Sequence, residues 1–428
     1  MHDLAVIGAG WAGYSAAIKA KKLGLKVCLI ENSFLGGTCL NHGCIPTKTL
    51  IQSAKVYSLI KKGPDFGIDS SEPKFDFAKV QQRKATVIDT LRRGMQQGLD
   101  GIDFITGRAS FISREEIECN GRNIQAKAFI VASGSQPLEI PQFKFDGRKI
   151  ISSNEALELQ DIPKSILIIG GGVIGCEFAS LFHNSGSLVT VAELMPQLLP
   201  GMDFEIARKL ETIFKKKKIV VKAGCDAAAL DLSEFDFILV CAGRIPATTG
   251  LNLEAIGVKL EKGRILTDEF LRTSIPSIFA AGDCTGKMML AHYASYQGEI
   301  AALNAADPAA MQKADNTVIP ACVFSDPEIA CVGLNDEVAK GAGRKISVRK
   351  FDFLSSGMAR VIGETEGFIK VTCEADSGRI LGASIIGPRA TELISVLGLA
   401  ISNNLTADQV SKTVFAHPSL AESFGEIF

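Results

Sequence analysis

Two cysteines, Cys39 and Cys44, lie five residues apart in the segment 36–48, which reads GGTCLNHGCIPTK. Such a pair can exchange between two thiols and a disulfide, which is two-electron redox chemistry. On an ideal helix this spacing is a rise of about 7.5 Å, whereas disulfides seldom join Cα atoms more than about 7 Å apart. If the sulfurs bond, we expect a helix that begins distorted, which Gly43 and Pro46 would permit. Because 11 cysteines in 428 residues give roughly 0.3 such pairs by chance, the surrounding sequence must carry the assignment.

That context is an internal repeat of two glycine-rich turns. Each follows a short apolar strand, at 3–7 and at 165–169, and reads G-x-G-x-x-G. A helix-like stretch and a second apolar strand that ends in a glutamate come next. The corresponding residues recur at a constant offset of 162: Gly8, Gly10, Gly13 and Glu31 in the first copy, and Gly170, Gly172, Gly175 and Glu193 in the second.

The repeat predicts two dinucleotide sites. Glycines let backbone N–H groups approach a pyrophosphate at a helix N-terminus, and the acid accepts hydrogen bonds from the adenosine ribose. The sequence therefore predicts an α/β fold with two Rossmann-like dinucleotide-binding domains. The alternative is that these glycines only permit close packing in ordinary β-α-β units without a ligand.

Changes in pattern along the chain indicate the domain boundaries. We expect residues 1–145 to form the first dinucleotide-binding domain and residues 146–245 the second, with 246–315 returning to the first. Residues 316–428 have an α+β pattern. The expected elements are helices around 51–62, 76–98 and 390–403, and strands within 126–135, 237–244, 278–283, 321–324, 367–372 and 380–386.

The composition is that of an ordinary globular chain, with 46% hydrophobic and 22% charged residues. A net charge of −1 gives no electrostatic case for a nucleic-acid or membrane partner. Scattered cysteines, a first strand at residue 3 and the lack of a long apolar run lead us to expect a cytoplasmic protein, although a processed organellar protein would look the same. The run Lys215–Lys218 is expected to be the solvated end of a helix rather than a polyanion site. No His/Cys cluster has zinc-ligand spacing, so we expect no metal.

Several motifs together resemble the pyridine nucleotide–disulfide oxidoreductase family. They are the segment 36–48, the two glycine turns, Gly282-Asp283, the sequence 290–292 and the terminal sequence 417–422, which reads HPSLAE. The resemblance covers essentially the whole chain. It is greatest to the members that oxidise dihydrolipoamide to lipoamide with NAD, in 2-oxo acid dehydrogenase or glycine cleavage complexes. It implies FAD in the first domain, NAD in the second, and a C-terminal α+β dimerisation domain.

The resemblance also implies a role for each cysteine. Cys39 would be the interchange thiol that reacts with the substrate, and Cys44 the thiolate beside the flavin. A helix that begins near Cys44 would favour that thiolate through its dipole. Lys48, one turn further on, would face the same ligand and pair with Glu177 beside the flavin's reactive nitrogen. The alternative for Cys39 and Cys44 is that both only pack in the core. The alternative for Lys48 and Glu177 is that both are ordinary surface charges.

The terminal signature implies a base supplied by the other subunit of a homodimer. His417, oriented by Glu422, would take a proton from the incoming dithiol. Without the terminal signature, His417, which precedes a proline, would be expected to be only a loop residue. We expect His42, inside the cysteine segment, to be a loop residue. Two features depart from the family pattern. Phe415 stands where relatives often carry another histidine, and the segment 194–242 is short, as if a β-hairpin were trimmed.

The remaining predicted cofactor contacts follow from the same resemblance. For FAD they are Gly37, Thr38, Lys48, Gly107, Ser133, Gly134, Asp283, Met289, Leu290, Ala291 and His292, in addition to the first turn and Glu31. For NAD, Gly243 is added to the second turn and Glu193.

Two other functions stay open. A glutathione-reductase-like enzyme would be expected to use NADPH, but Glu193 is followed by LMPQ, without an arginine for a 2′-phosphate. A redox-inactive structural subunit would not need the catalytic set implied above. We therefore predict a homodimeric dehydrogenase that acts on dihydrolipoamide carried by a lipoyl-bearing protein and that could dock on the core subunit of a complex.

Overall fold

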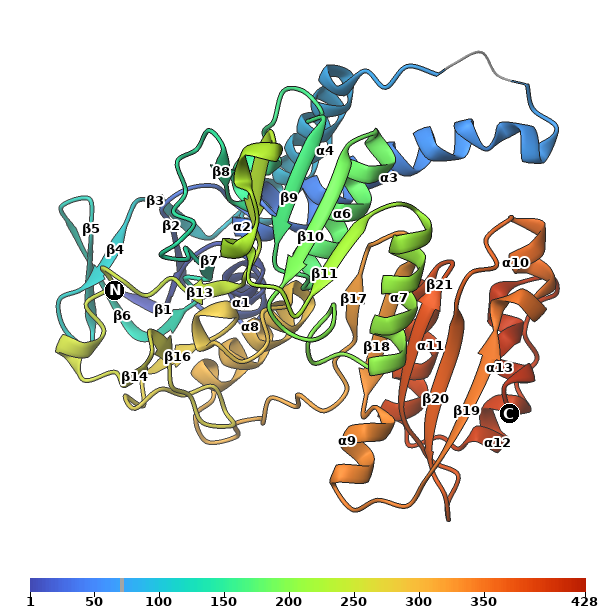
Figure 1. Ribbon diagram of the computed structural model, residues 1–428. Helices are drawn as coiled ribbons and strands as arrows, with labels where there is room; N and C mark the ends of the chain where they lie inside the picture. The colour runs from blue at the N-terminus through green and yellow to red at the C-terminus, as the bar shows by residue number, and fades with distance from the viewer. Residues whose placement is uncertain (70–72) are drawn as a thin grey trace.

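The computed structural model describes residues 1–69 and 73–428 (Figure 1). Its first sheet has the order β3-β2-β1-β6-β5-β4, with β16 also paired to β6. The strands β1, β2, β3, β6 and β16 run parallel. Pairing of β16 with β6 returns the chain to the first domain, as we expected for the strand within 278–283. The strands are β1 (His2–Ile7), β2 (Val27–Glu31), β3 (Asp103–Thr106), β4 (Ala109–Phe111), β5 (Glu116–Cys119), β6 (Arg122–Val131) and β16 (Ile278–Ala280).

Two helices pack closely beside this sheet. They are α1 (Trp11–Lys22), which follows the first glycine turn, and α8 (Ala291–Ala306). A Cβ atom on Gly298 of α8 would lie 2.0 Å from the Ala12 carbonyl oxygen of α1, so only glycine allows this approach. The packing holds the N-terminal ends of both helices against the strand ends that should bind a dinucleotide.

The second sheet is fully parallel, in the order β11-β10-β9-β12-β8. Its central strands are continuous apolar runs because both faces are buried. Between β11 and β12, a stretch described throughout, the chain forms two short 3-10 helices and no strand, in agreement with the trimmed hairpin. The elements are β8 (Ile150–Ile151), α5 (Ser153–Ala156), β9 (Ser165–Ile169), α6 (Val173–Ser185), β10 (Leu188–Glu193), α7 (Phe204–Lys216), β11 (Val220–Ala223), η2 (Ala227–Ala229), η3 (Leu232–Glu234) and β12 (Phe237–Val240).

The third sheet is antiparallel, in the order β17-β18-β21-β20-β19. The expected strands and the long helix are present, but β18 and β19 were missed. β19 is a largely exposed edge strand with a polar sequence, ISVRKFD, so it lacks the apolar signal of a strand. The elements are β17 (Ala321–Val323), β18 (Glu328–Gly333), α9 (Asp336–Gly341), β19 (Ile346–Asp352), η6 (Phe353–Ser355), α10 (Gly357–Val361), β20 (Phe368–Glu374), β21 (Ile380–Gly387), α11 (Ala390–Ser402), α12 (Ala407–Ser411), η7 (Leu420–Glu422) and α13 (Ser423–Glu426).

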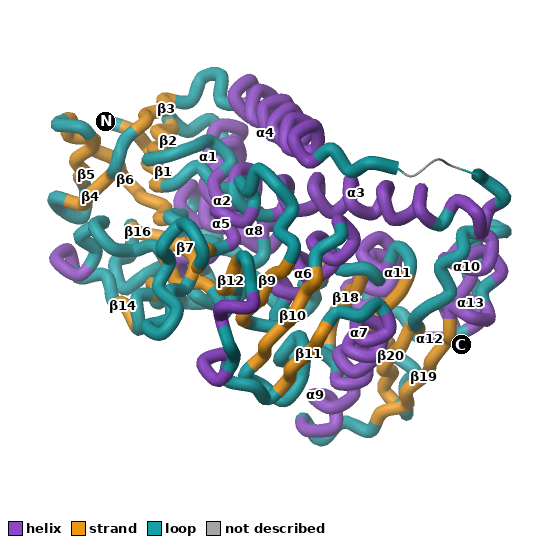
Figure 2. The backbone as a smooth tube through the Cα atoms, turned by 45° about the horizontal axis from the view of Figure 1, so that its top comes forward, coloured by secondary structure: helices purple, strands orange, loops and turns teal. Residues whose placement is uncertain are grey.

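The cysteine segment leads into helices that join these parts (Figure 2). α3 packs against α4 and α6, so it connects the first glycine turn to the second domain. Both polar helices expected from the sequence are present. The elements are α2 (Gly37–Asn41), α3 (Cys44–Lys61), η1 (Gly63–Phe66), α4 (Phe77–Gly98), β7 (Ser135–Pro137), β13 (Arg244–Pro246), η4 (Glu254–Ile256), β14 (Leu260–Glu261), β15 (Arg264–Ile265) and η5 (Asp283–Thr285).

We expected the basic run at the end of α7 to be simply solvated, but two of its lysines form ion pairs. Lys216 Nζ lies 2.8 Å from Glu366 Oε1, and Lys217 Nζ lies 2.6 Å from Asp326 Oδ2. These pairs join the second domain to loops of the third sheet, since α7 packs against β21 of that sheet. In the described part of the chain, no helix is both long and apolar enough to cross a membrane.

Candidate active site

Cys39 and Cys44 lie on two different helices. Cys39 is on α2, and Cys44 is the first residue of α3. The chain breaks between them at His42 (φ −138°) and Gly43 (φ −150°), so a new helix begins at Cys44, in agreement with the helix start expected there. The break removes the constraint of an ideal helical rise. Both cysteines are thiols here, and their sulfur atoms lie within hydrogen-bonding reach of one another.

The two thiols have very different acidities. Accepting a hydrogen bond from the Cys39 thiol lowers the pKa of Cys44 to about 7, with further help from the Lys48 cation and against the effect of burial. The same contact, together with burial, raises the pKa of Cys39. The first thiolate of the reduced pair therefore forms on Cys44, at the start of α3, where the helix dipole also favours it.

The Lys48–Glu177 pair implied by the family resemblance is present. Lys48 Nζ on α3 lies 2.8 Å from both Glu177 oxygens on α6. The Glu177 side chain is only 4% exposed, and its Oε1 also accepts from the Phe324 backbone N–H at 3.0 Å. The ammonium group also lies 4.8 Å from the centre of the Phe324 ring. The alternative of two unpaired surface charges is excluded, and Phe324 is a neighbour that the sequence did not indicate.

Both glycine turns have the shape of a dinucleotide site. Gly8 and Gly170 have φ values of +100° and +107°, and a Cβ on either would lie 2.3 Å or 2.6 Å from a backbone oxygen. The residues that precede α1 and α6 are Gly10 and Gly172, and within the described residues no side chain caps either helix. The first N–H groups of both helices are therefore available to a pyrophosphate. Gly13 and Gly175 permit the close return of each helix onto its turn.

The two acids at the strand ends bind their own glycine turns. Glu31 Oε2 accepts from the Ala9 N–H at 2.6 Å, and Glu193 Oε2 accepts from the Gly171 N–H at 2.6 Å. Each of the two glutamates is 7% exposed. A carboxylate oxygen has more than one acceptor site, so both acids can still accept from a ribose hydroxyl. The fold thus fixes the acid and the turn together.

Two buried polar atoms near the first turn face only the sulfurs of Cys39 and Cys284 and make no hydrogen bond to an oxygen or nitrogen among the described residues. They are Trp11 Nε1, at the start of α1, and Ser133 Oγ, just after β6. Buried polar groups normally have a partner. Together with the glycine cradle, these atoms fit a bound FAD.

The predicted flavin residue Asp283 belongs to a network that the sequence did not reveal. Ser135 Oγ donates to Asp283 Oδ2 at 2.6 Å, and Arg244 donates to Ser135 Oγ and to its carbonyl oxygen, both at 2.8 Å. Burial lowers the pKa of Arg244, and Asp283 opposes that effect. The pairing of β7 with β13 brings these groups together. The Gly243-Arg244 sequence after β12 was the only signal for this arginine.

The other predicted contacts lie at the ends of strands or at helix starts. A Cβ on Gly37 would lie 2.7 Å from the Gly10 Cα, so the cysteine segment rests directly on the first turn, with Thr38 next in α2. Gly134, Gly107 and Gly243 follow β6, β3 and β12. Met289, Leu290 and Ala291 lead into α8, and His292 Nε2 lies 2.8 Å from the Pro320 oxygen.

His417 and Glu422 form a pair that is separate from the cysteines of the same chain. His417 Nδ1 lies 2.7 Å from Glu422 Oε1, and the histidine side chain is 84% exposed. A hydrogen bond from the Ser419 N–H, and to a lesser extent one from His417, holds the pKa of Glu422 below its usual value. The adjacent helix α13 lies in the third domain, well away from α2 in both views (Figures 1 and 2). His42 is the loop residue that we expected, at the end of α2.

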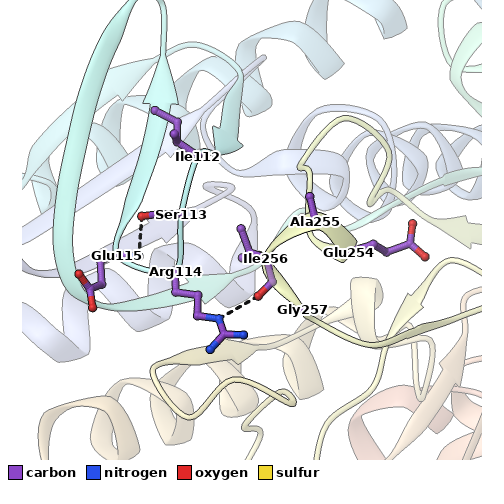
Figure 3. Close-up of a pocket in the computed structure, with 8 residues that line it drawn as sticks. All are labelled: Ile112, Ser113, Arg114, Glu115, Glu254, Ala255, Ile256 and Gly257. Atoms are coloured by element: carbon purple, nitrogen blue, oxygen red, sulfur yellow. Dashed lines mark hydrogen bonds between the residues drawn. The ribbon is translucent and has the colours of Figure 1, made fainter.

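A shallow hollow of about 540 Å³ lies apart from these groups (Figure 3). It is lined by residues 112–115 and 254–257, and Arg114 Nε donates to the Ile256 oxygen across it at 3.0 Å. Its lining contains none of the site residues predicted from the sequence. The functional site is therefore built around the glycine turns and not around this hollow.

Comparison with curated proteins gives relatives over nearly the whole length. The dihydrolipoyl dehydrogenase of Chlorobaculum parvum is 39% identical over 449 aligned residues, which cover 99% of this chain and 96% of the relative. The dihydrolipoyl dehydrogenase of Geobacillus stearothermophilus is 40% identical over 442 residues, covering 97% and 93%. Both relatives therefore align along all three domains.

Solved structures have the same fold. The HOCl-induced flavoprotein disulfide reductase RclA from Escherichia coli has a TM-score of 0.89 and 29% identity, covering 99% of each chain. LpdA from Mycobacterium tuberculosis has a TM-score of 0.91 and 26% identity, covering 99% of this chain and 98% of that one. The family model for pyridine nucleotide-disulphide oxidoreductases matches residues 2–298, and the model for their dimerisation domain matches residues 319–428. The chain belongs to the pyridine nucleotide-disulphide oxidoreductase family.

Proposed function

We propose that the chain is one subunit of a homodimeric, FAD- and NAD-dependent enzyme that oxidises dihydrolipoamide to lipoamide. The observation that carries the proposal is the contact between the Cys39 and Cys44 thiols, with the Lys48–Glu177 pair one helical turn beyond it. Full-length similarity to dihydrolipoyl dehydrogenases supports the choice of substrate. The matched dimerisation domain supports the homodimer.

Each dinucleotide has its own set of residues. The first turn, Glu31, Ser133 and Asp283 would hold FAD, and the second turn with Glu193 would hold NAD. Bound FAD would accept an electron pair from the cysteine dithiol and deliver it as a hydride to NAD⁺. Lys48 and Glu177 place a balanced pair of charges beside that transfer.

The thiol chemistry belongs to the chain itself. His417 of the partner subunit would take a proton from dihydrolipoamide, and the resulting thiolate would attack Cys39 Sγ. The Cys39–Cys44 disulfide then breaks, and Cys44 leaves as a thiolate that its low pKa stabilises. The second substrate thiol would then give up its proton and attack the substrate sulfur of the mixed disulfide. The bond from that sulfur to Cys39 breaks, Cys39 takes up the proton, and lipoamide leaves with its disulfide closed. The electron pair stays on Cys39 and Cys44.

Three finer assignments complete the proposal. The domain boundaries are those expected from the sequence: 1–145 with 246–315, 146–245, and 316–428. The lipoyl group would be carried on another protein, and the dimer would dock on the core subunit of a 2-oxo acid dehydrogenase or glycine cleavage complex. The scattered cysteines support a cytoplasmic location.

A substrate panel tests the proposed activity. Dihydrolipoamide, glutathione and mercuric ion would each be assayed with both nicotinamide cofactors. We expect rapid NADH formation from dihydrolipoamide, its loss in Cys39→Ser, and full activity in Cys331→Ser, whose cysteine lies on β18 of the third sheet. A preference for NADPH and glutathione disulfide would contradict the proposal and favour a glutathione-reductase-like enzyme.

A further inference from the structure

Three side chains of metal-ligating types meet at the amino-terminal edge of the first sheet. His2 begins β1, Cys28 lies near the start of β2, and Asp103 begins β3. Cys28 and Asp103 are direct register partners on neighbouring parallel strands. One ligand atom of each residue lies within 4.8 Å of those of the other two. Because the residues are 26 and 75 positions apart, no local spacing in the sequence could indicate this cluster.

One of the three distances is already close to that between two ligands of a zinc ion. Tetrahedral zinc with bonds of about 2.0–2.3 Å places its ligand atoms about 3.3–3.8 Å apart. His2 Nε2 and Asp103 Oδ2 are already 3.2 Å apart. The buried Cys28 sulfur is fixed by the sheet, whereas the Asp103 side chain is 55% exposed and can turn. A rotation of Asp103, with a small movement of the imidazole, would therefore complete the set.

One nitrogen of the histidine ring also lacks a partner. His2 Nδ1 is buried and accepts or donates no hydrogen bond among the described residues. A buried ring nitrogen without a partner is uncommon in a folded protein. With Asp103 at the surface, a water molecule can occupy the fourth position.

We propose that His2, Cys28 and Asp103 bind one Zn²⁺ ion, which joins β1, β2 and β3 at their amino-terminal ends. Sulfur, imidazole nitrogen and carboxylate oxygen together are a ligand set that suits zinc. Binding would displace the Cys28 thiol proton to solvent and would involve no change of oxidation state. The glycine turn lies at the opposite, carboxyl end of the same strands, so the ion stabilises the domain and takes no part in electron transfer.

Metal titration of the tag-free, flavin-loaded protein tests this site. The Cys39→Ser/Cys44→Ser background prevents the redox pair from binding metal. We expect one equivalent of Zn²⁺ per chain, and Co²⁺ in its place should give the absorption of a cobalt–thiolate bond. Substitution of Cys28→Ala, His2→Gln or Asp103→Asn should weaken Zn²⁺ binding by about 100-fold or more, since each removes a direct ligand.

Cys119→Ala is the matched control. Cys119 is also fully buried, on β5 of the same sheet, but lies outside the cluster. It should keep Zn²⁺ binding and the cobalt–thiolate absorption. If Cys28→Ala fails to fold, His2→Gln and Asp103→Asn carry the test because they alter less buried side chains. Absence of Zn²⁺ binding, or binding that none of the three substitutions weakens, would reduce the cluster to a His–Asp contact beside a packing cysteine.

Discussion

The Lys48 ammonium group contacts both carboxylate oxygens of Glu177 at 2.8 Å, although the two residues are 129 positions apart. The contact joins α3, which begins at Cys44, to α6, which begins at the second glycine turn. Both charges also act on Cys44: the Lys48 cation lowers its pKa and the Glu177 carboxylate raises it. The pair therefore links the redox helix to the NAD domain and adjusts the acidity of the thiolate, which depends first on the hydrogen bond from Cys39.

Removal of the Lys48 charge and removal of the Glu177 charge should shift the pKa of Cys44 in opposite directions. In the reduced, flavin-loaded enzyme the thiolate should be present above pH about 7 and should disappear as the pH falls through that value. Lys48→Met should raise the midpoint by about one pH unit, and Glu177→Gln should lower it. The measurement is a pH titration of the long-wavelength absorption that a thiolate gives beside flavin. Lys61→Met, at the far end of α3, is the control and should leave the midpoint unchanged; equal shifts in all three variants would refute the assignment.

The two cysteines should differ when each is replaced. Both Cys39→Ser and Cys44→Ser should abolish dihydrolipoamide oxidation, since thiol–disulfide exchange needs two sulfurs. With Cys44 left alone near the flavin, Cys39→Ser should show the long-wavelength absorption band, and Cys44→Ser should not. Visible spectra of the two purified proteins decide the matter. The reverse pattern would exchange the roles of the two cysteines.

The exposed His417–Glu422 pair predicts complementation between subunits. His417→Gln and Cys39→Ser homodimers should each be inactive. If His417 serves the neighbouring chain, a mixed dimer should regain one working site, because one subunit supplies the histidine and the other the cysteine. Activity is measured after subunit exchange, with exchange itself followed by mass spectrometry. Complete exchange without recovered activity would place the base elsewhere.

Glu193 should make the enzyme prefer NAD. A 2′-phosphate carries a charge of about −1.5 to −2, and at about 4 Å with an effective dielectric constant near 20 each like-charge pair costs about 4 kcal/mol before screening. Even after relaxation and salt, we expect roughly 100-fold or greater preference for NAD, at about 1.4 kcal/mol per tenfold. Values of kcat/KM for NAD⁺ and NADP⁺ should be compared in the wild type and in Glu193→Ala.

In that variant the preference should shrink, because the carboxylate that holds the Gly171 turn and repels the phosphate is lost. A wild-type enzyme that uses both cofactors equally would remove this role from Glu193.

Arg244 should support flavin binding through Ser135 and Asp283. Arg244→Met removes two hydrogen bonds to Ser135, whose hydroxyl donates to Asp283. Hydrogen bonds to charged groups contribute about 1.5–3 kcal/mol, so FAD affinity should fall by about ten- to a hundredfold. Flavin titration of the apoprotein measures the effect. Arg264→Met, which removes an exposed arginine bound to Glu261, is the control; an equal loss in both variants would indicate only general destabilisation.

Local patterns in the sequence determined the parts of the molecule whose conformation depends on near neighbours. The glycine turns, the apolar strands preceding them and the acids after them recur at a constant offset, so the sequence alone indicates two dinucleotide-binding folds. Glycine is required there by backbone conformation and close approach, which are local requirements. The polar helices α3 and α4 and the start of α3 at Cys44 were predicted for the same reason.

The tertiary structure decided what depends on distant residues meeting. The close contact of Gly37 with Gly10, which places the cysteine segment on the first glycine turn, joins residues 27 positions apart. The Ser135–Arg244 link and the His2–Cys28–Asp103 cluster arise where strands far apart in sequence become neighbours. Edge strand β19 was missed because solvent exposure on both faces removes the apolar pattern. Side-chain types and their spacing along the chain indicate which chemical groups each local element carries. Strand order and helix packing decide which of these groups meet in one site.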